Sequence, residues 1–177
     1  MIPNGNWAAL RFLVHPPSEN SISATSRPLF LVDDDEADRL ILTRLMRATG
    51  LSNPCRMFPR GDALIDALIE VLRGAPAPLA CFLDVKMPGM NGFDVLRWIR
   101  CQHALDDIPV VMLSSSEEQR DLHEAQHFGA QCYVAKFPPA ETFRLIVDEA
   151  QRVAAAATIT PFKLPCNLLL GTGAAVA

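Results

Sequence analysis

Acidic side chains follow two apolar segments of the chain, at the point where each segment ends. Residues 33–35 are three aspartates directly after the apolar residues 29–32, and Asp84 directly follows residues 79–83. If both segments are parallel strands, their carboxyl ends meet at one edge of the sheet and bring the carboxylates together. Neighbouring carboxylates raise each other's pKa, and a divalent cation relieves this repulsion. Because hard oxygen ligands suit Mg²⁺, we expect a magnesium site at this edge.

The three consecutive aspartates are expected to have different roles. An aspartate immediately before a helix commonly caps its first turn, so Asp35 is predicted to be the N-cap of the helix that follows. Asp33 and Asp34 are the predicted metal ligands.

A hydroxyl group and a cation are expected at the same edge. A fourth apolar segment ends in serines 114–116, and a fifth ends at Lys136. The ammonium group of a lysine can contact phosphoryl oxygens as a point charge. Taken alone, such a serine is ordinarily a helix cap and such a lysine a solvated residue. The joint order of these residues after successive strands is much more specific.

These residues must be positioned by a sheet. Five short apolar segments alternate with segments of helical period, which is typical of a βα series that builds a parallel sheet. Most of them are continuously apolar, as expected for strands that helices cover on both faces. We predict an α/β fold, a doubly wound (βα)5 three-layer sandwich. The predicted strands are Leu29–Val32, Cys55–Phe58, Leu79–Leu83, Ile108–Leu113 and Cys132–Ala135.

Apolar residues recur at helical spacing between the predicted strands, and these stripes are expected to face the core. In the fourth helix, Ser116 and Gln119 resemble a capping box, and Gly129 is expected to close the helix. The predicted stripes are Ala37, Leu40, Ile41, Leu45 and Ala48, then Leu64, Ala67, Leu68 and Val71, and finally Phe143, Ile146, Val147 and Ala150.

The composition is that of a folded domain. The 177 residues carry a formal net charge of −4 without a long basic run, so nucleic-acid binding is not expected. The five cysteines include no Cys-x-x-Cys pair, which argues against a disulfide framework and a zinc ribbon. No segment approaches the roughly 20 apolar residues that cross a bilayer. We expect a cytoplasmic protein that does not bind membranes.

The chain is predicted to have three parts. Residues 1–27 are rich in Pro, Ser and Asn and are expected to form a poorly ordered extension. Residues 28–155 contain the predicted sandwich. Residues 156–177 are predicted to be a C-terminal tail, and no attached output domain is expected.

Four sequence blocks together carry a resemblance to a known family. They are Leu-Val-Asp-Asp-Asp at 31–35, Leu-Asp-Val-Lys-Met-Pro-Gly-Met-Asn-Gly at 83–92, Pro-Val-Val-Met-Leu-Ser-Ser at 109–115 and Tyr-Val-Ala-Lys at 133–136. In this order they resemble the response-regulator receiver domains. The resemblance implies a flavodoxin-like fold with the strand order 2-1-3-4-5, as in the chemotaxis regulator of that family.

The resemblance also implies roles for the residues at the strand ends. Asp84 would be the phosphoacceptor, and Lys136 would contact the phosphoryl oxygens. Mg²⁺ would be held by Asp33, Asp34 and Asp84, with help from the backbone carbonyl of Lys86. These roles fit phosphoryl transfer, because its transition state places charge on oxygens that a metal ion and a lysine can surround.

Two further residues match the family's switch positions. Ser114 would be the switch hydroxyl and Tyr133 its aromatic partner. A new phosphate would draw in Ser114, leave room for Tyr133 to turn inward, and change the surface of the fourth helix, fifth strand and fifth helix. For Tyr133, the alternative is a half-buried packing residue with a hydrated hydroxyl.

The implied function is that of a stand-alone response regulator, which is phosphorylated itself and does not turn over a substrate. Through the sequence Asp-Arg-Leu at 38–40, the chain is most similar to single-domain regulators that partner phytochrome-type kinases. The implied phosphodonor is a sensor histidine kinase, with a phytochrome-type kinase as one candidate, or a phosphotransfer protein. A downstream protein would be the target, and a homodimer is left open.

The chain departs from the family pattern at the fifth strand. The family usually has proline directly after the lysine, joined by a cis peptide bond that aims the lysine, whereas this chain has Lys136, Phe137 and Pro138. A cis bond before a residue other than proline costs about 2.5–4 kcal/mol, so we expect either a strained bond or a rebuilt loop. The departure motivates an alternative function, an adaptor that does not accept phosphate.

A second alternative comes from residues 123–127, whose sequence His-Glu-Ala-Gln-His matches the zinc-protease motif His-Glu-x-x-His. A zinc hydrolase needs a third ligand in a buried cleft. Because these residues fall in the fourth predicted helix, away from the strand ends, a solvated face is the favoured interpretation.

Overall fold

The computed structural model describes residues 27–115, 119–156 and 162, and its centre is a parallel sheet of five strands. The strand order is β2-β1-β3-β4-β5, which confirms the predicted doubly wound fold. Three predicted strands have the bounds that were expected, and the other two begin one or two residues later and end one residue later. The strands are β1 (Leu29–Val32), β2 (Cys55–Phe58), β3 (Ala80–Asp84), β4 (Val110–Ser114) and β5 (Cys132–Ala135).

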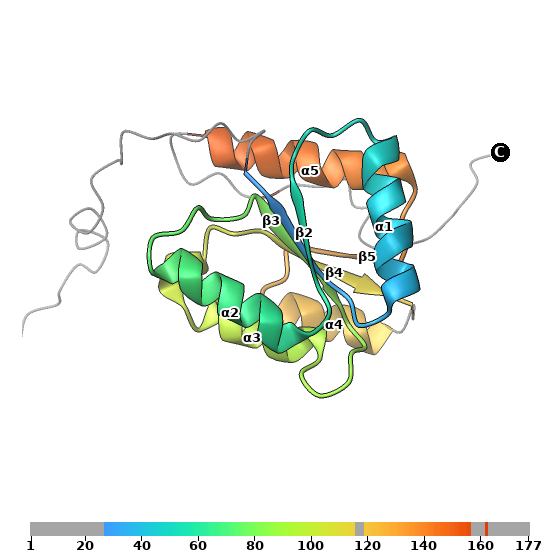
Figure 1. Cartoon of the computed structure of the whole chain (residues 1–177). Helices are drawn as coiled ribbons and strands as arrows, with labels where there is room; N and C mark the ends of the chain where they lie inside the picture. Colours follow the sequence, from blue (N-terminus) through green and yellow to red (C-terminus); the bar gives the residue numbers. More distant parts are fainter. Residues whose placement is uncertain (1–26, 116–118, 157–161, 163–177) are drawn as a thin grey trace, which may run out of the picture.

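Helices cover both faces of the sheet (Figure 1). One face carries α1 and α5, and the other carries α2, α3 and α4. A short 3-10 helix, η3 (His103–Leu105), lies between α3 and β4. The helices are α1 (Glu36–Ala48), α2 (Gly61–Leu72), α3 (Gly92–Arg100), α4 (Gln119–His127) and α5 (Ala140–Ala155).

The apolar strands supply both layers of the core, because successive side chains point to opposite faces of a sheet. In β1, Phe30 and Val32 pack toward α2 and α3, whereas Leu29 and Leu31 pack toward α1 and α5. In β3, Phe82 stacks on Phe143 of α5, with ring centroids 4.7 Å apart. The continuous apolar runs therefore indicate burial on both faces, as predicted.

The predicted core stripe of the first helix is wrong except at Leu45, which is partly buried and packs against the core. Leu40 and Ile41 are exposed, and the buried residues of α1 are Leu42 and Met46. Apolar residues cover more than one face of this helix, so spacing alone left its rotation undecided. The stripe of α5 is confirmed in full, and that of α2 is confirmed except for Val71, which is partly buried.

The described part of the chain has no helix that is both long and apolar enough to cross a bilayer. The fourth helix closes as predicted, with Gly129 in a left-handed conformation two residues beyond the last helical residue, His127 (φ 83°). Its proposed capping residue, Ser116, lies outside the described residues.

Candidate functional site

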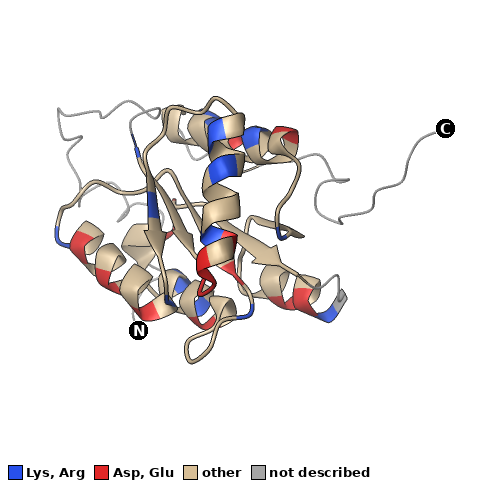
Figure 2. Cartoon of the chain, turned by 45° about the vertical axis from the view of Figure 1, so that its right-hand side comes forward, with Lys and Arg blue, Asp and Glu red and all other residues tan. Residues whose placement is uncertain are grey.

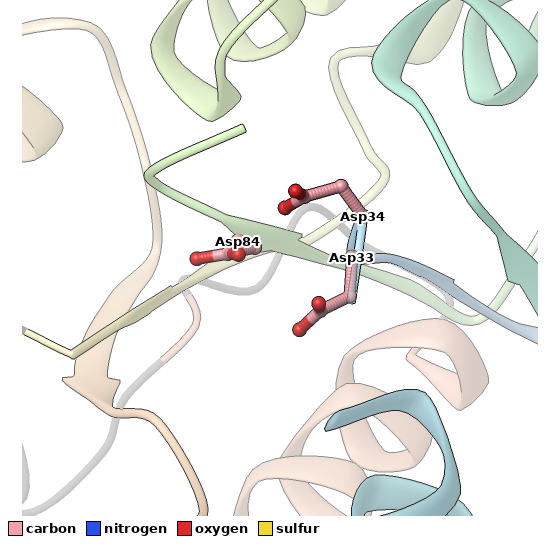
Figure 3. A group of neighbouring side chains, drawn as sticks. All are labelled: Asp33, Asp34 and Asp84. Atoms are coloured by element: carbon pink, nitrogen blue, oxygen red, sulfur yellow. The ribbon is translucent and has the colours of Figure 1, made fainter. Parts of the chain in front are cut away.

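The parallel register brings the polar strand ends to one edge of the sheet. Asp84 pairs with Leu113, and Ser114 pairs with Ala135, so β3, β4 and β5 end at the same level. Figure 3 shows Asp33 and Asp34 at the end of β1 beside Asp84 at the end of β3. One carboxylate oxygen from each of these residues lies within 4.8 Å of the others. The predicted carboxylate cluster is therefore formed.

The loop before α1 separates the roles of its three aspartates. The Asp35 carboxylate accepts hydrogen bonds from the backbone N–H groups of Ala37 (2.7 Å) and Asp38 (3.2 Å), so Asp35 is the N-cap as predicted. Arg39 Nη1 donates to the backbone carbonyls of Asp33 (2.7 Å) and Asp34 (2.9 Å). These contacts fix the acidic loop against the first turn of α1.

The connection from β3 to α3 is equally well fixed. Asp84 Oδ1 accepts a hydrogen bond from the backbone N–H of Lys86 at 3.3 Å. A Cβ atom on Gly92 would lie 2.3 Å from the carbonyl oxygen of Asp84, so only glycine allows α3 to begin this close to the strand end. Asn91 and Asp94 form a reciprocal capping box at the start of α3.

Lys136 reaches the same cluster from β5. Its Nζ lies 2.9 Å from Asp33 Oδ2 and 3.0 Å from Asp84 Oδ2, and it also contacts the carboxylate of Asp38. The side chain of Lys136 is 10% exposed. The structure thus joins Lys136 to the predicted ligands and adds Asp38, which the sequence prediction did not include. The only sequence signal was its place in an acidic first turn.

Burial controls the protonation of the cluster. Asp33 and Asp84 are 0% and 2% exposed, and burial raises the pKa of both carboxyl groups, with Lys136 acting in the opposite direction. For Lys136, burial alone would lower the pKa, but its contacts with Asp38, Asp33 and Asp84 raise it overall. The lysine therefore remains a cation.

The loop after Lys136 is rebuilt without a cis bond. All peptide bonds among the described residues are trans, and Phe137 adopts a left-handed backbone conformation with φ of 62°. This conformation is uncommon for a bulky residue. Of the two outcomes expected for Lys136 and Phe137, the rebuilt loop is the one observed. Because Lys136 still reaches Asp84, the missing proline no longer supports the adaptor alternative.

The two predicted switch residues are both buried. Ser114 is 2% exposed at the end of β4, and its backbone carbonyl accepts a hydrogen bond from the N–H of Lys136 at 2.6 Å. Tyr133 is 8% exposed and belongs to the core beneath α2, α3 and α4. Tyr133 already lies inside the protein, so this structure does not show the outward position from which its turn was expected to start.

The His-Glu-x-x-His motif lies on α4, with both His123 and His127 exposed. Within the described part of the chain, the only group of at least three His, Cys, Asp or Glu residues close enough to share an ion is Asp33, Asp34 and Asp84. Among the described residues no third ligand lies beside the two histidines, so nothing in this part of the chain supports a zinc hydrolase.

The carboxylate cluster itself suits a hard divalent cation. It offers three carboxylate oxygens, the ligand type that Mg²⁺ prefers. Asp33 Oδ2 is buried and faces the Lys136 ammonium at 2.9 Å. Asp34 is exposed, which leaves one side of the cluster open to solvent. The residues present therefore fit Mg²⁺.

Comparisons with known proteins find relatives in both sequence and structure. A sequence profile of the response regulator receiver domain matches residues 29–156. The transcriptional regulatory protein GltR of Pseudomonas aeruginosa is 36% identical over 121 residues, which is 68% of this chain and 47% of GltR. The chain thus spans about half the length of this relative, and less of several others.

Two solved structures are similar over nearly the whole described fold. The bacteriophytochrome response regulator AtBRR has a TM-score of 0.63 and 28% identity, covering 75% of this chain and 97% of AtBRR. The bacteriophytochrome response regulator RtBRR also has a TM-score of 0.63 and 28% identity, covering 81% of this chain and 86% of RtBRR.

Receiver domains of two-component systems accept phosphoryl groups, bind Mg²⁺ in an acidic pocket and partner with histidine kinases. The strand order, the acidic edge of the sheet and the matching profile all fit a receiver domain. This chain belongs to the response regulator receiver domain family.

Proposed function

We propose that this chain accepts a phosphoryl group on Asp84 and signals through the resulting change of its surface. One observation carries the proposal: Asp84 is a buried carboxylate at a strand end, 3.0 Å from the Lys136 ammonium and beside two further carboxylates. Ordinary buried carboxylates are rare unless they are paired. Here two partners of opposite kinds, a cation and an acidic pair, surround the proposed nucleophile.

The proposed reaction transfers a phosphoryl group from a phosphohistidine to Asp84. A carboxylate oxygen of Asp84 forms a bond to phosphorus while the phosphorus–nitrogen bond breaks, and the imidazole leaves with the electron pair. Lys136 holds its positive charge beside the phosphoryl oxygens. Asp33, Asp34, Asp84 and the backbone carbonyl of Lys86 would hold Mg²⁺, which when bound offsets negative charge on those oxygens.

The proposed output is a change of the surface made by α4, β5 and α5. The Ser114 hydroxyl would donate to a phosphoryl oxygen, and the packing of Tyr133 on β5 would change with it. The burial of both side chains supports this coupling, because a buried Ser114 cannot move without displacing the side chains packed around it. Tyr133 as a passive packing residue remains the alternative.

We further propose a sensor histidine kinase or a phosphotransfer protein as phosphodonor and a downstream protein as target. The similarity to AtBRR and RtBRR, which are bacteriophytochrome response regulators, supports a phytochrome-type kinase. The proposed domain covers residues 28–155, between an N-terminal extension and a C-terminal tail. A cytoplasmic regulator that does not bind nucleic acid fits this proposal, and a homodimer is compatible with it.

Incubation with Mg²⁺ and phosphoramidate, followed by intact-mass measurement, tests the acceptor. We expect the wild type to gain the mass of one phosphoryl group and Asp84→Asn to gain none. Asp66→Asn is the matched control, because Asp66 is exposed on α2 and should leave the adduct unchanged. No adduct on the wild type, or an adduct on Asp84→Asn, would contradict the proposal.

A further inference from the structure

Asp38 contacts the ammonium group of Lys136 but is not part of the carboxylate cluster that could hold a metal ion. Its carboxylate pairs with Lys136 Nζ, whereas the group with converging oxygens is Asp33, Asp34 and Asp84. The side chain of Asp38 is 26% exposed, against 0% for Asp33 and 4% for Asp84. The Lys136 ammonium therefore contacts both the buried cluster and the more exposed carboxylate of Asp38.

The backbone holds Asp38 in place. Its N–H donates to the N-cap carboxylate of Asp35, and the next residue, Arg39, is anchored to the carbonyls of Asp33 and Asp34. These contacts tie the first turn of α1 to the acidic loop. Asp38 thus has a fixed position relative to the cluster, even though its side chain is partly open to solvent.

The backbone of Lys136 gives the lysine less support. Phe137 follows it in a left-handed conformation, and no proline fixes the chain directly after the lysine. A lysine side chain has four rotatable bonds, and ordering it costs about 2 kcal/mol of rotamer entropy. The Phe137 ring lies 5.9 Å from Nζ, close to the outer limit for a cation–π contact. A charged partner outside the metal cluster would therefore help to orient the Lys136 side chain.

We infer that Asp38 is a positioning residue that aims the Lys136 ammonium at the phosphoryl group on Asp84. The inference rests on the proposed function and deepens it. Asp38 can keep its contact with Lys136 while Asp33, Asp34 and Asp84 are occupied by a metal ion and a phosphoryl group. It touches neither phosphorus nor the attacking oxygen, so its effect must pass through the lysine.

The test measures phosphorylation of Asp84 by phosphoramidate with Mg²⁺ at increasing donor concentration. We expect Asp38→Asn to lower the maximal rate about tenfold, equivalent to about 1.4 kcal/mol, without changing the donor concentration for half-maximal rate. Asp38→Glu, which keeps the charge, should recover part of the loss. Asp62→Asn is the matched control, since Asp62 is an exposed aspartate in the first turn of α2 and should leave the rate unchanged.

A double-mutant cycle separates positioning from a general structural effect. In a Lys136→Ala background, Asp38→Asn should change the rate less than twofold, because the residue through which it acts is gone. If Lys136→Ala reacts too slowly for its rate to be measured, the same four proteins are compared by their affinity for beryllofluoride in the presence of Mg²⁺, measured by calorimetric titration. The urea midpoint of Asp38→Asn reports whether the variant is folded.

The outcomes are distinct. If wild type forms no adduct, the proposed function fails. If wild type forms the adduct and Asp38→Asn reacts within twofold of it, the positioning role is overturned while the acceptor stands. A tenfold loss that persists in the Lys136→Ala background also overturns the role, because the effect would then not pass through the lysine.

Discussion

Two strand ends at the same edge of the sheet present opposite charges, and the loops that follow them are fixed in different ways. The loop that follows Asp84, from β3 to α3, ends in a capping box and Gly92. The loop from β5 to α5 carries Lys136, passes through Phe137 in a left-handed conformation, and ends at Pro139, an N-cap without a side-chain hydrogen bond. The first loop is determined by residues near in sequence. The second depends on a partner from α1.

This difference explains where the chain can depart from the pattern of its family. A carboxylate acceptor must meet its metal ligands closely, and the tight start of α3 leaves little room for change. A lysine has a long side chain, so its ammonium group can reach the site from a different backbone conformation if another residue holds that group in place. Figure 2 shows the acidic residues around the start of α1 that make this possible, with basic residues farther along the same helix.

Gly92→Ala should break the first loop and have the largest effect. The new methyl group would lie 2.3 Å from the Asp84 carbonyl oxygen, so the helix or the strand end must move. We expect a loss of roughly 3 kcal/mol in the free energy of unfolding, measured by urea denaturation. Gly50→Ala is the control, because Gly50 has φ of 70° with open space around it and should lose only about 1 kcal/mol. Equal losses would argue against the close approach.

Replacement of Phe137 sharpens the comparison at the second loop. Glycine adopts φ of 62° without the steric cost that alanine has there, so Phe137→Gly should be more stable than Phe137→Ala by about 1 kcal/mol. At exposed Arg44 of α1 the order should be reversed, with Arg44→Ala more stable than Arg44→Gly by about 1 kcal/mol. Urea denaturation of the four variants checks both orders. The same order at both sites would contradict a left-handed Phe137.

Asp84→Asn should show that a negative charge at the proposed acceptor position destabilises the fold without metal. Burial raises the pKa of Asp84, so the folded state binds its proton more tightly than the unfolded state. The free energy of unfolding therefore falls as pH rises from the ordinary value of about 3.9 through the raised pKa. At pH 7 in chelator, we expect Asp84→Asn to be more stable than wild type by ~1 kcal/mol.

The control for Asp84→Asn is how its difference in stability from wild type depends on pH and on Mg²⁺. Below the ordinary carboxyl pKa the difference should vanish, because Asp84 is then protonated in both states. Mg²⁺ should stabilise wild type more than Asp84→Asn, since binding to the folded state adds to its stability. Urea denaturation at both pH values measures this. A less stable Asp84→Asn at pH 7 would show that the contact with Lys136 outweighs burial.

Much of the fold could be predicted from local patterns. The strands β1, β2 and β5 have their predicted bounds, because continuous apolar runs between turn residues mark buried strands directly. The rotation of α1 could not be predicted in this way. Its apolar residues fit more than one face, and packing on the sheet selected Leu42 and Met46.

The sequence by itself determined which residues stand at the strand ends, and hence the meeting of Asp33, Asp34, Asp84 and Lys136 at one edge. The parallel direction follows from the βα pattern and the strand order was implied by the family resemblance, and together they place these ends at one edge. The tertiary structure alone decided the left-handed Phe137 and the contact between Asp38 and Lys136. A pairing between two elements far apart in sequence depends on how α1 and β5 dock on the sheet, and no local pattern records that docking.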